Sequence, residues 1–124
     1  MDSTPLVAIV DDDEAACEAV AALVRSFGYR VAEFHSASAF LQSGSLARTA
    51  CLIVDMRMPG MTGLDLYRHL LGGGTPVPTI IMTAHATEAS RTSALEAGVR
   101  CYLPKPVQPD ALLTCIRSAM AHRA

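Results

Sequence analysis

The sequence has no cluster of basic residues, no long apolar run and only one lysine. Its ten basic residues are nearly balanced by twelve acidic ones among 124 residues. No stretch concentrates Lys or Arg as binding to a phosphate backbone requires. The longest apolar runs are about a quarter of the roughly 20 residues that a membrane-spanning helix needs. The sequence therefore predicts a chain that binds neither nucleic acid nor a membrane directly.

Cysteines are few and carry no pairing motif. The absence of a C-x-x-C pair argues against a zinc site and against a thioredoxin-type redox motif. The N-terminus also lacks a charged segment followed by an apolar one, so a secretion signal is not expected. We expect a reduced, cytoplasmic protein whose thiols are small core side chains, with a reactive thiol at Cys101 as an alternative. The cysteines are Cys17, Cys51, Cys101 and Cys115.

Glycine and proline are too few for a disordered or fibrous chain, at 8 and 7 residues, while 51% of the residues are hydrophobic. A length of 124 residues suits one globular domain with one core. We therefore expect residues 1–124 to form a single domain. His35, His69 and His122 show no metal-ligand spacing and are expected to be ordinary surface or core residues.

Short apolar runs alternate with helical patterns along the chain. Each run is rich in β-branched residues and bounded by turn residues, which is typical of a buried strand. Each helical pattern has apolar residues three or four apart and is bounded by a capping residue, a glycine or a proline. The expected strands are 6–10, 29–34, 51–54, 79–82 and 101–103. The expected helices are 14–27, a short one between Ser36 and Gly44, 64–71, 88–97 and 109–120. Helix 88–97 is polar on most faces, so we expect it to be thinly anchored and able to shift.

Strands that consist of solid apolar runs are buried on both faces. The alternation therefore predicts an α/β fold, a doubly wound sheet of five parallel strands with helices on both sides. Ligands of such folds bind outside the carboxyl ends of the strands. The polar residues expected at that edge are Asp11, Asp12, Asp55, Thr83 and Lys105.

Three carboxylates at one edge repel one another and need a cation. At an effective dielectric of about 20, two carboxylates roughly 4 to 5 Å apart repel by roughly 3 to 4 kcal/mol. Oxygen ligands with no His or Cys nearby suit Mg²⁺ or Mn²⁺ rather than zinc. Lys105 and the Thr83 hydroxyl are not needed to hold an ion, but both suit an incoming phosphoryl group. The residues therefore indicate phosphoryl transfer to a carboxylate.

Each residue at this edge also has an ordinary structural explanation. The acidic run from Asp11 could cap the next helix, and Asp55 could open a turn. Thr83 could simply end a strand, and Lys105 could be a solvated loop residue. Their coincidence at one edge of one sheet favours the functional interpretation.

Several motifs at this edge match one family. They are Asp55-Met56-Arg57-Met58-Pro59-Gly60-Met61-Thr62-Gly63, Thr83-Ala84-His85 and Lys105-Pro106. With them the chain resembles the receiver domain of two-component response regulators over nearly its whole length, and most closely the FixJ-type branch. The resemblance implies a flavodoxin-like sheet with the strand order 2-1-3-4-5. It also implies a signalling phosphoacceptor rather than a turnover enzyme.

The resemblance further implies a role for each residue at the edge. Asp55 would be the phosphoacceptor, supplied by a phosphohistidine on a sensor kinase or phosphotransfer protein. Mg²⁺, which Mn²⁺ could replace, would be bound by Asp12, Asp55 and the backbone carbonyl of Arg57. Asp11 would orient the ion through water, and Lys105 would pair with a phosphoryl oxygen.

A conformational switch is implied in the same way. Thr83 would hydrogen-bond another phosphoryl oxygen, and Tyr102 would turn inward to fill the vacated space. The Lys105–Pro106 bond would be cis, and His85 is expected to tune hydrolysis of the acyl phosphate. The readout face would be the fourth helix, fifth strand and fifth helix, acting on a downstream protein, an effector domain or, as a phosphorylation-dependent dimer, a second copy.

The sequence leaves alternatives open for both the domain context and the chemistry of the chain. FixJ-type receivers usually precede a DNA-binding domain, so this chain would be either a single-domain regulator or the N-terminal part of a transcription regulator. A metal-dependent phosphatase with an Asp-x-Asp pair is a rival, although Arg57 stands where the second carboxylate would be. A second rival interpretation is a receiver-like interaction module that is never phosphorylated.

Overall fold

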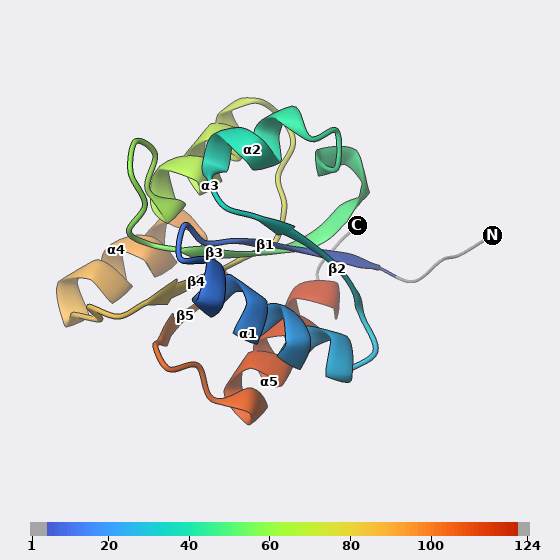
Figure 1. Ribbon diagram of the computed structural model, residues 1–124. Coiled ribbons are helices and arrows are strands. Elements are labelled where there is room, and N and C mark those ends of the chain that lie inside the picture. The colour runs from blue at the N-terminus through green and yellow to red at the C-terminus, as the bar shows by residue number, and fades with distance from the viewer. Residues whose placement is uncertain (1–4, 122–124) are drawn as a thin grey trace.

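Strands and helices alternate along the chain (Figure 1), as the hydrophobic periodicity predicts. The structure, a computed structural model, describes residues 5–121. Within this range the strands are β1 (Leu6–Val10), β2 (Arg30–Phe34), β3 (Thr49–Asp55), β4 (Thr79–Thr83) and β5 (Cys101–Pro104). The helices are α1 (Glu14–Ser26), α2 (Ala37–Gln42), α3 (Gly63–Gly72), α4 (Glu88–Ala97) and α5 (Pro109–Ala121), with a 3-10 turn at Leu46–Arg48.

The strands form one parallel sheet in the order β2-β1-β3-β4-β5. The crossovers place α1 and α5 on one face, and α2, α3 and α4 on the other (Figure 1). Alternate residues of β3 face the two cores: Leu52 and Val54 pack with α2, α3 and α4, whereas Cys51 and Ile53 pack with α1 and α5. All four are fully buried. The doubly wound α/β fold with this strand order is therefore confirmed.

The register of the sheet brings the strand ends to a common edge. Val10 lies beside Val54, and Asp55 lies beside Met82. Because the strands are parallel, their carboxyl ends all meet at this edge. The chain runs from β1 outward to β2 and then returns to β3 on the other side, so the topology reverses between β1 and β3. This is where doubly wound folds bind their ligands.

Short polar side chains and one glycine set the start of the helices at this edge. Asp13 caps α1, and Thr62 forms a reciprocal capping box with Asp65 at the start of α3. A Cβ atom at Gly63 would lie 2.6 Å from the carbonyl oxygen of Asp55. The start of α3 therefore packs directly against the end of β3 only because residue 63 has no side chain.

The third strand is longer than the apolar run predicts. It begins at Thr49 and includes Asp55, which is its last residue rather than the first residue of a turn. The Met56 N–H donates to the Met82 carbonyl at 2.8 Å and continues the ladder past Asp55. The backbone of Asp55 is consequently fixed in the sheet, beside β4.

The expectation that all four cysteines are free thiols is wrong for two of them. Cys101 in β5 and Cys115 in α5 form a disulfide, with Cα atoms 6.2 Å apart. Cys101 faces the core shared by α1 and α5, where Cys115 also packs. The two cysteines lack the C-x-x-C spacing that would have indicated a pair in the sequence. The disulfide also rules out the free reactive thiol considered at Cys101. Cys17 and Cys51 are buried free thiols, as expected.

Two of the histidines lie at the surface. His35 and His69 are exposed, whereas His122 lies outside the described residues, as do residues 1–4, 123 and 124 of the expected domain. Between residues 5 and 121, no helix combines the length and the apolar character needed to cross a bilayer.

Candidate functional site

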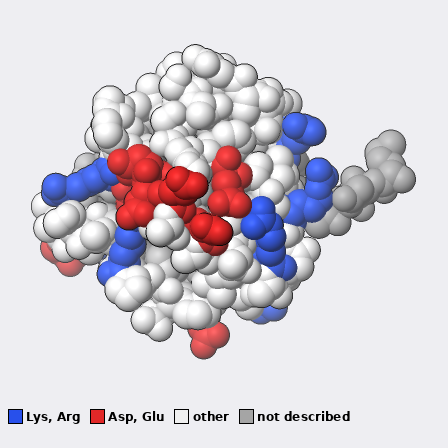
Figure 2. Space-filling model, in the orientation of Figure 1, with Lys and Arg blue, Asp and Glu red and all other residues white. Residues whose placement is uncertain are grey.

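Three carboxylates meet where β1 and β3 end. Asp11 and Asp12 directly follow β1, Asp55 ends β3, and one carboxylate oxygen from each lies within 4.8 Å of the others. Asp11 and Asp55 are 0% and 7% exposed, whereas Asp12 is open to solvent. Figure 2 shows acidic side chains gathered near the middle of this face, with basic side chains spread around them. The sheet edge thus brings together the three acids that the sequence predicts there.

The only lysine of the chain lies between the two buried carboxylates. Lys105 Nζ is 2.8 Å from Asp11 Oδ2 and 2.8 Å from Asp55 Oδ1. Its backbone N–H donates to the Thr83 carbonyl at 2.8 Å, and the following bond to Pro106 is cis. Charge-assisted bonds of this kind are about twice as strong as neutral ones. The ammonium therefore offsets the repulsion between the two carboxylates.

The three consecutive acids that follow β1, Asp11 to Asp13, make different contacts. Asp11 accepts the Asp13 N–H on Oδ1 at 3.0 Å and the Lys105 ammonium on Oδ2, so both of its oxygens are held. Asp13 accepts the Ala16 N–H at 3.1 Å and caps α1. Asp12 lies between them and faces solvent beside Asp55. The ordinary explanation of this run as a helix cap thus accounts for Asp13 but not for Asp11 or Asp12.

The charges of the site shift the pKa values of two groups. Burial raises the pKa of Asp55, the charges of Asp11 and Asp12 raise it further, and the bond to Lys105 opposes them in part. Burial acts to lower the pKa of Lys105, but its bonds to Asp11 and Asp55 outweigh burial and raise it. Lys105 is therefore a permanent cation at neutral pH. Three carboxylates still outnumber one ammonium, so the edge favours binding a further cation.

Thr83 lies at the same edge, at the end of β4. Its side chain is 1% exposed, and its hydroxyl oxygen accepts the His85 N–H at 3.1 Å. Its carbonyl receives the Lys105 N–H. His85 itself is exposed. A single residue thus connects the Lys105 backbone with the loop that leads into α4.

Tyr102 is buried in β5, at 4% exposure. Its hydroxyl donates to Ser90 Oγ of α4 at 2.7 Å. This bond links the strand that leads to Lys105 with the helix that follows Thr83. Ser90 carries no signal in the sequence, because its contact with Tyr102 depends on how α4 packs over β5.

The ligand set of the acidic cluster suits a hard cation. All its side-chain ligand atoms are carboxylate oxygens, which Mg²⁺ and Mn²⁺ prefer. Asp11 and Asp55 are already fixed by packing or by Lys105. Arg57 lies two residues beyond Asp55, in the loop before α3, with its side chain exposed. The cluster could therefore hold a divalent ion at the exposed side of Asp55.

Comparison with known proteins identifies a family. The family model described as response regulator receiver domain matches residues 7–117. The response regulator protein TmoT of Ectopseudomonas mendocina is 41% identical over 119 residues, which cover 96% of this chain and 54% of TmoT. The transcriptional regulatory protein FixJ of Azorhizobium caulinodans is 34% identical over 118 residues, covering 95% of this chain and 56% of FixJ.

Solved structures agree with the sequence comparison. The crystal structure of FixJ-N has a TM-score of 0.88 and 31% identity, covering 100% of this chain and 98% of that one. The response regulator StyR has a TM-score of 0.86 and 37% identity, covering 96% of this chain and 60% of StyR. The chain spans about half the length of the curated relatives it matches. The resemblance to FixJ-type receivers is thus confirmed, and the chain belongs to the receiver domains of two-component response regulators.

Proposed function

We propose that Asp55 accepts a phosphoryl group from a phosphohistidine of a sensor kinase or phosphotransfer protein. The observation that carries the proposal is the position of Lys105 Nζ, 2.8 Å from both Asp11 and Asp55 in a site with an excess of carboxylates. An ion pair that only stabilised the fold would not require a third, exposed carboxylate beside it. A nucleophile that receives an anionic group does require both charge compensation and access.

The chemistry follows from the groups at the site. An Asp55 carboxylate oxygen attacks phosphorus, the phosphorus–nitrogen bond of the phosphohistidine breaks, and its electron pair returns to the imidazole nitrogen. Mg²⁺ would be held by Asp12, Asp55 and the backbone carbonyl of Arg57, with Asp11 orienting its water, and would neutralise charge on the transferred group. Lys105 exchanges its bond to Asp55 for one to a phosphoryl oxygen.

Signal output would begin at Thr83. Its hydroxyl turns to donate to another phosphoryl oxygen, which draws in the loop that leads to α4. Tyr102 and its bond to Ser90 transmit this change to the face formed by α4, β5 and α5. Phosphorylation should therefore alter amide hydrogen exchange in α4, and an unchanged response in Tyr102→Ala would contradict this role.

The biological setting is part of the proposal. The receiver spans residues 1–124, lies in the cytoplasm and acts on a downstream protein, an attached effector domain or a second phosphorylated copy. Regulation of transcription is supported by the relatives named FixJ, which are transcriptional regulatory proteins. The domain turns over no external substrate and only hydrolyses its own acyl phosphate. If His85 guides the water for that step, His85→Ala should change the autodephosphorylation rate.

Labelling with acetyl phosphate and Mg²⁺ tests the proposal. The wild-type chain should take up one phosphoryl group, and Asp55→Asn should take up none. Asp110→Asn is the matched control, because Asp110 is an exposed acid in the first turn of α5. Continuous release of phosphate from a monoester would instead indicate a phosphatase. No labelling of a folded, Mg²⁺-supplied wild-type chain would indicate an interaction module, and either result would overturn the proposal.

A further inference from the structure

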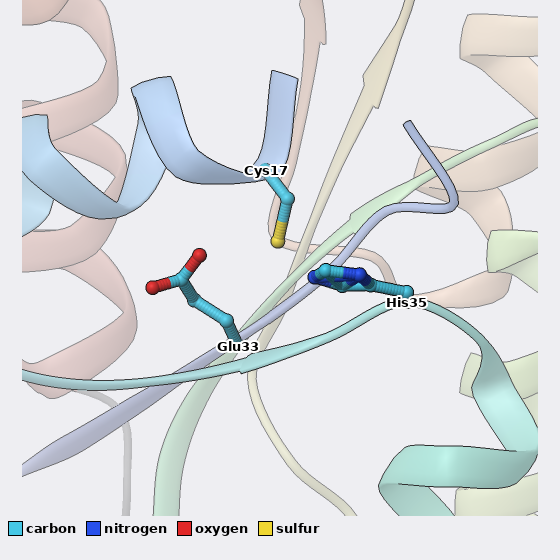
Figure 3. Close-up of side chains that lie close together, drawn as sticks. All are labelled: Cys17, Glu33 and His35. Carbon is cyan, nitrogen blue, oxygen red and sulfur yellow. The ribbon is translucent and has the colours of Figure 1, made fainter. Parts of the chain in front are cut away.

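A second group of metal-ligand side chains lies between α1 and β2. Cys17 comes from α1, Glu33 from β2, and His35 directly follows β2. The Cys17 sulfur, a Glu33 carboxylate oxygen and a His35 ring nitrogen all lie within 4.8 Å of one another. Figure 3 shows the Cys17 sulfur between the Glu33 carboxylate and the His35 ring. Apart from the acidic cluster, it is the only such group within residues 5–121.

The backbone places these side chains together for a simple reason. Glu33 and His35 are two residues apart on an extended segment, so their side chains leave the same face of the sheet. The residue between them, Phe34, points to the opposite face, where its ring packs 5.3 Å from that of Phe40. Cys17 projects from α1 toward the same face of the sheet as Glu33 (Figure 3). It is fully buried, and its sulfur lies 3.9 Å from the carbonyl oxygens of Ile9 and Phe34.

The donor set differs from that of the acidic cluster. It offers sulfur, nitrogen and oxygen, which are the ligands of zinc, whereas an all-oxygen set suits Mg²⁺. Three protein ligands leave a fourth tetrahedral position free, and the exposed His35 marks the side from which a water molecule can reach it. We propose that Cys17, Glu33 and His35 form a Zn²⁺-binding site. This inference does not depend on phosphorylation of Asp55.

Two local features oppose binding of the ion: a surface ion pair at Glu33, which is weak, and the proton on Cys17. Arg25 Nη2 lies 3.2 Å from Glu33 Oε2, but both side chains are partly exposed, and such surface pairs contribute about 0 to 1 kcal/mol. Burial, with the charges of Glu33 and Asp11, raises the pKa of the Cys17 thiol to about 11. The thiol is therefore protonated before the ion binds. A coordinated Zn²⁺ replaces that proton, which leaves to solvent.

Cobalt spectroscopy of the full chain tests the site, because Co²⁺ occupies zinc sites and absorbs light. Excess Mg²⁺ should occupy the acidic cluster, and anaerobic buffer without reductant keeps the Cys101–Cys115 disulfide closed. One equivalent of Co²⁺ should give a thiolate-to-cobalt charge-transfer band that Zn²⁺ abolishes by displacement. Cys17→Ser should remove the band. His35→Ala, at an exposed position, should fold normally and weaken Co²⁺ binding at least about tenfold.

Matched variants separate this site from other thiols and imidazoles. Cys51→Ser and His69→Ala change a buried thiol and an exposed histidine elsewhere, and both should keep the band and the affinity. A spectrum without a thiolate band would overturn the proposal. So would a band that survives Cys17→Ser, or wild-type affinity in both His35→Ala and Glu33→Gln, because the sulfur would then act alone.

Discussion

The two helices that flank β5 are held in different ways. α5 is fixed by a row of buried side chains and by the disulfide from Cys115 to Cys101 of β5. α4 buries only Ala94 among its residues, and its Leu95 is 37% exposed. A hydrogen bond from Tyr102 to Ser90 links it to β5. One side of the proposed output face is thus rigid and the other loosely held, so a signal from Thr83 is expected to move α4 rather than α5.

Core truncations give the largest expected contrast between these helices. Ile116 of α5 is fully buried, so Ile116→Ala should lower the free energy of unfolding by about 2 to 5 kcal/mol. Leu95→Ala in α4 should change it by less than about 1 kcal/mol, because its side chain already contacts water. Urea unfolding of both variants measures the difference. Equal losses would mean that α4 is anchored as firmly as α5.

Opening the disulfide should have the next largest effect. A crosslink between residues separated by 14 positions stabilises a chain by about 3 kcal/mol through loss of unfolded-state entropy. Reductant should lower the stability of the oxidised wild type by about that amount while the fold persists, because Leu112 and Ile116 still hold α5. Cys115→Ser has no bond to open and should not respond. A response of equal size in Cys115→Ser would show that the reductant acts elsewhere.

Removing the link between α4 and β5 should have a smaller effect on stability and a local effect on motion. Tyr102→Phe and Ser90→Ala should each cost about 1 kcal/mol, and the double variant should cost little more than either. Amide hydrogen exchange should become faster in α4 and stay unchanged in α5. Additive losses in the double variant would show that the two hydroxyls do not stabilise each other.

The elements of the fold could be predicted because each is specified locally. Apolar runs, capping residues and terminal glycines gave the strands and helices, and parallel strands bring their carboxyl ends together. The convergence of Asp11, Asp12, Asp55 and Lys105 follows from that topology. What the local pattern did not specify was the rotation of each helix about its axis.

That rotation determines the contacts the sequence did not reveal. Cys115 meets Cys101, and Ser90 meets Tyr102, only because α5 and α4 pack on β5 as they do. Cys17 approaches Glu33 and His35 through the packing of α1 on β2. Here a partial signal existed: Glu33 on a predicted strand and His35 directly after it are two residues apart on extended chain and share a face. The third ligand, Cys17, lies far away in the sequence.

The charge arrangement around Asp55 is the basis of the proposed function, and it predicts how stability depends on pH. The pKa of Asp55 is raised in the folded chain, so the native state holds this proton more tightly than the unfolded state. Its contribution to stability is present below the unfolded pKa and is lost as pH rises through the folded pKa. Asp55→Asn should therefore be more stable than wild type at pH 7, and the advantage should fade in acid.

Titration of the Asp55 carboxyl carbon by NMR, in wild type and in Lys105→Met, tests that arrangement most directly. We expect a pKa above that of an ordinary aspartate in wild type, because the carboxyl is buried beside two other acids. We expect a further rise in Lys105→Met, because the ammonium that favours the ionised form is gone. An ordinary pKa in wild type, or one that Lys105→Met leaves unchanged, would contradict the account.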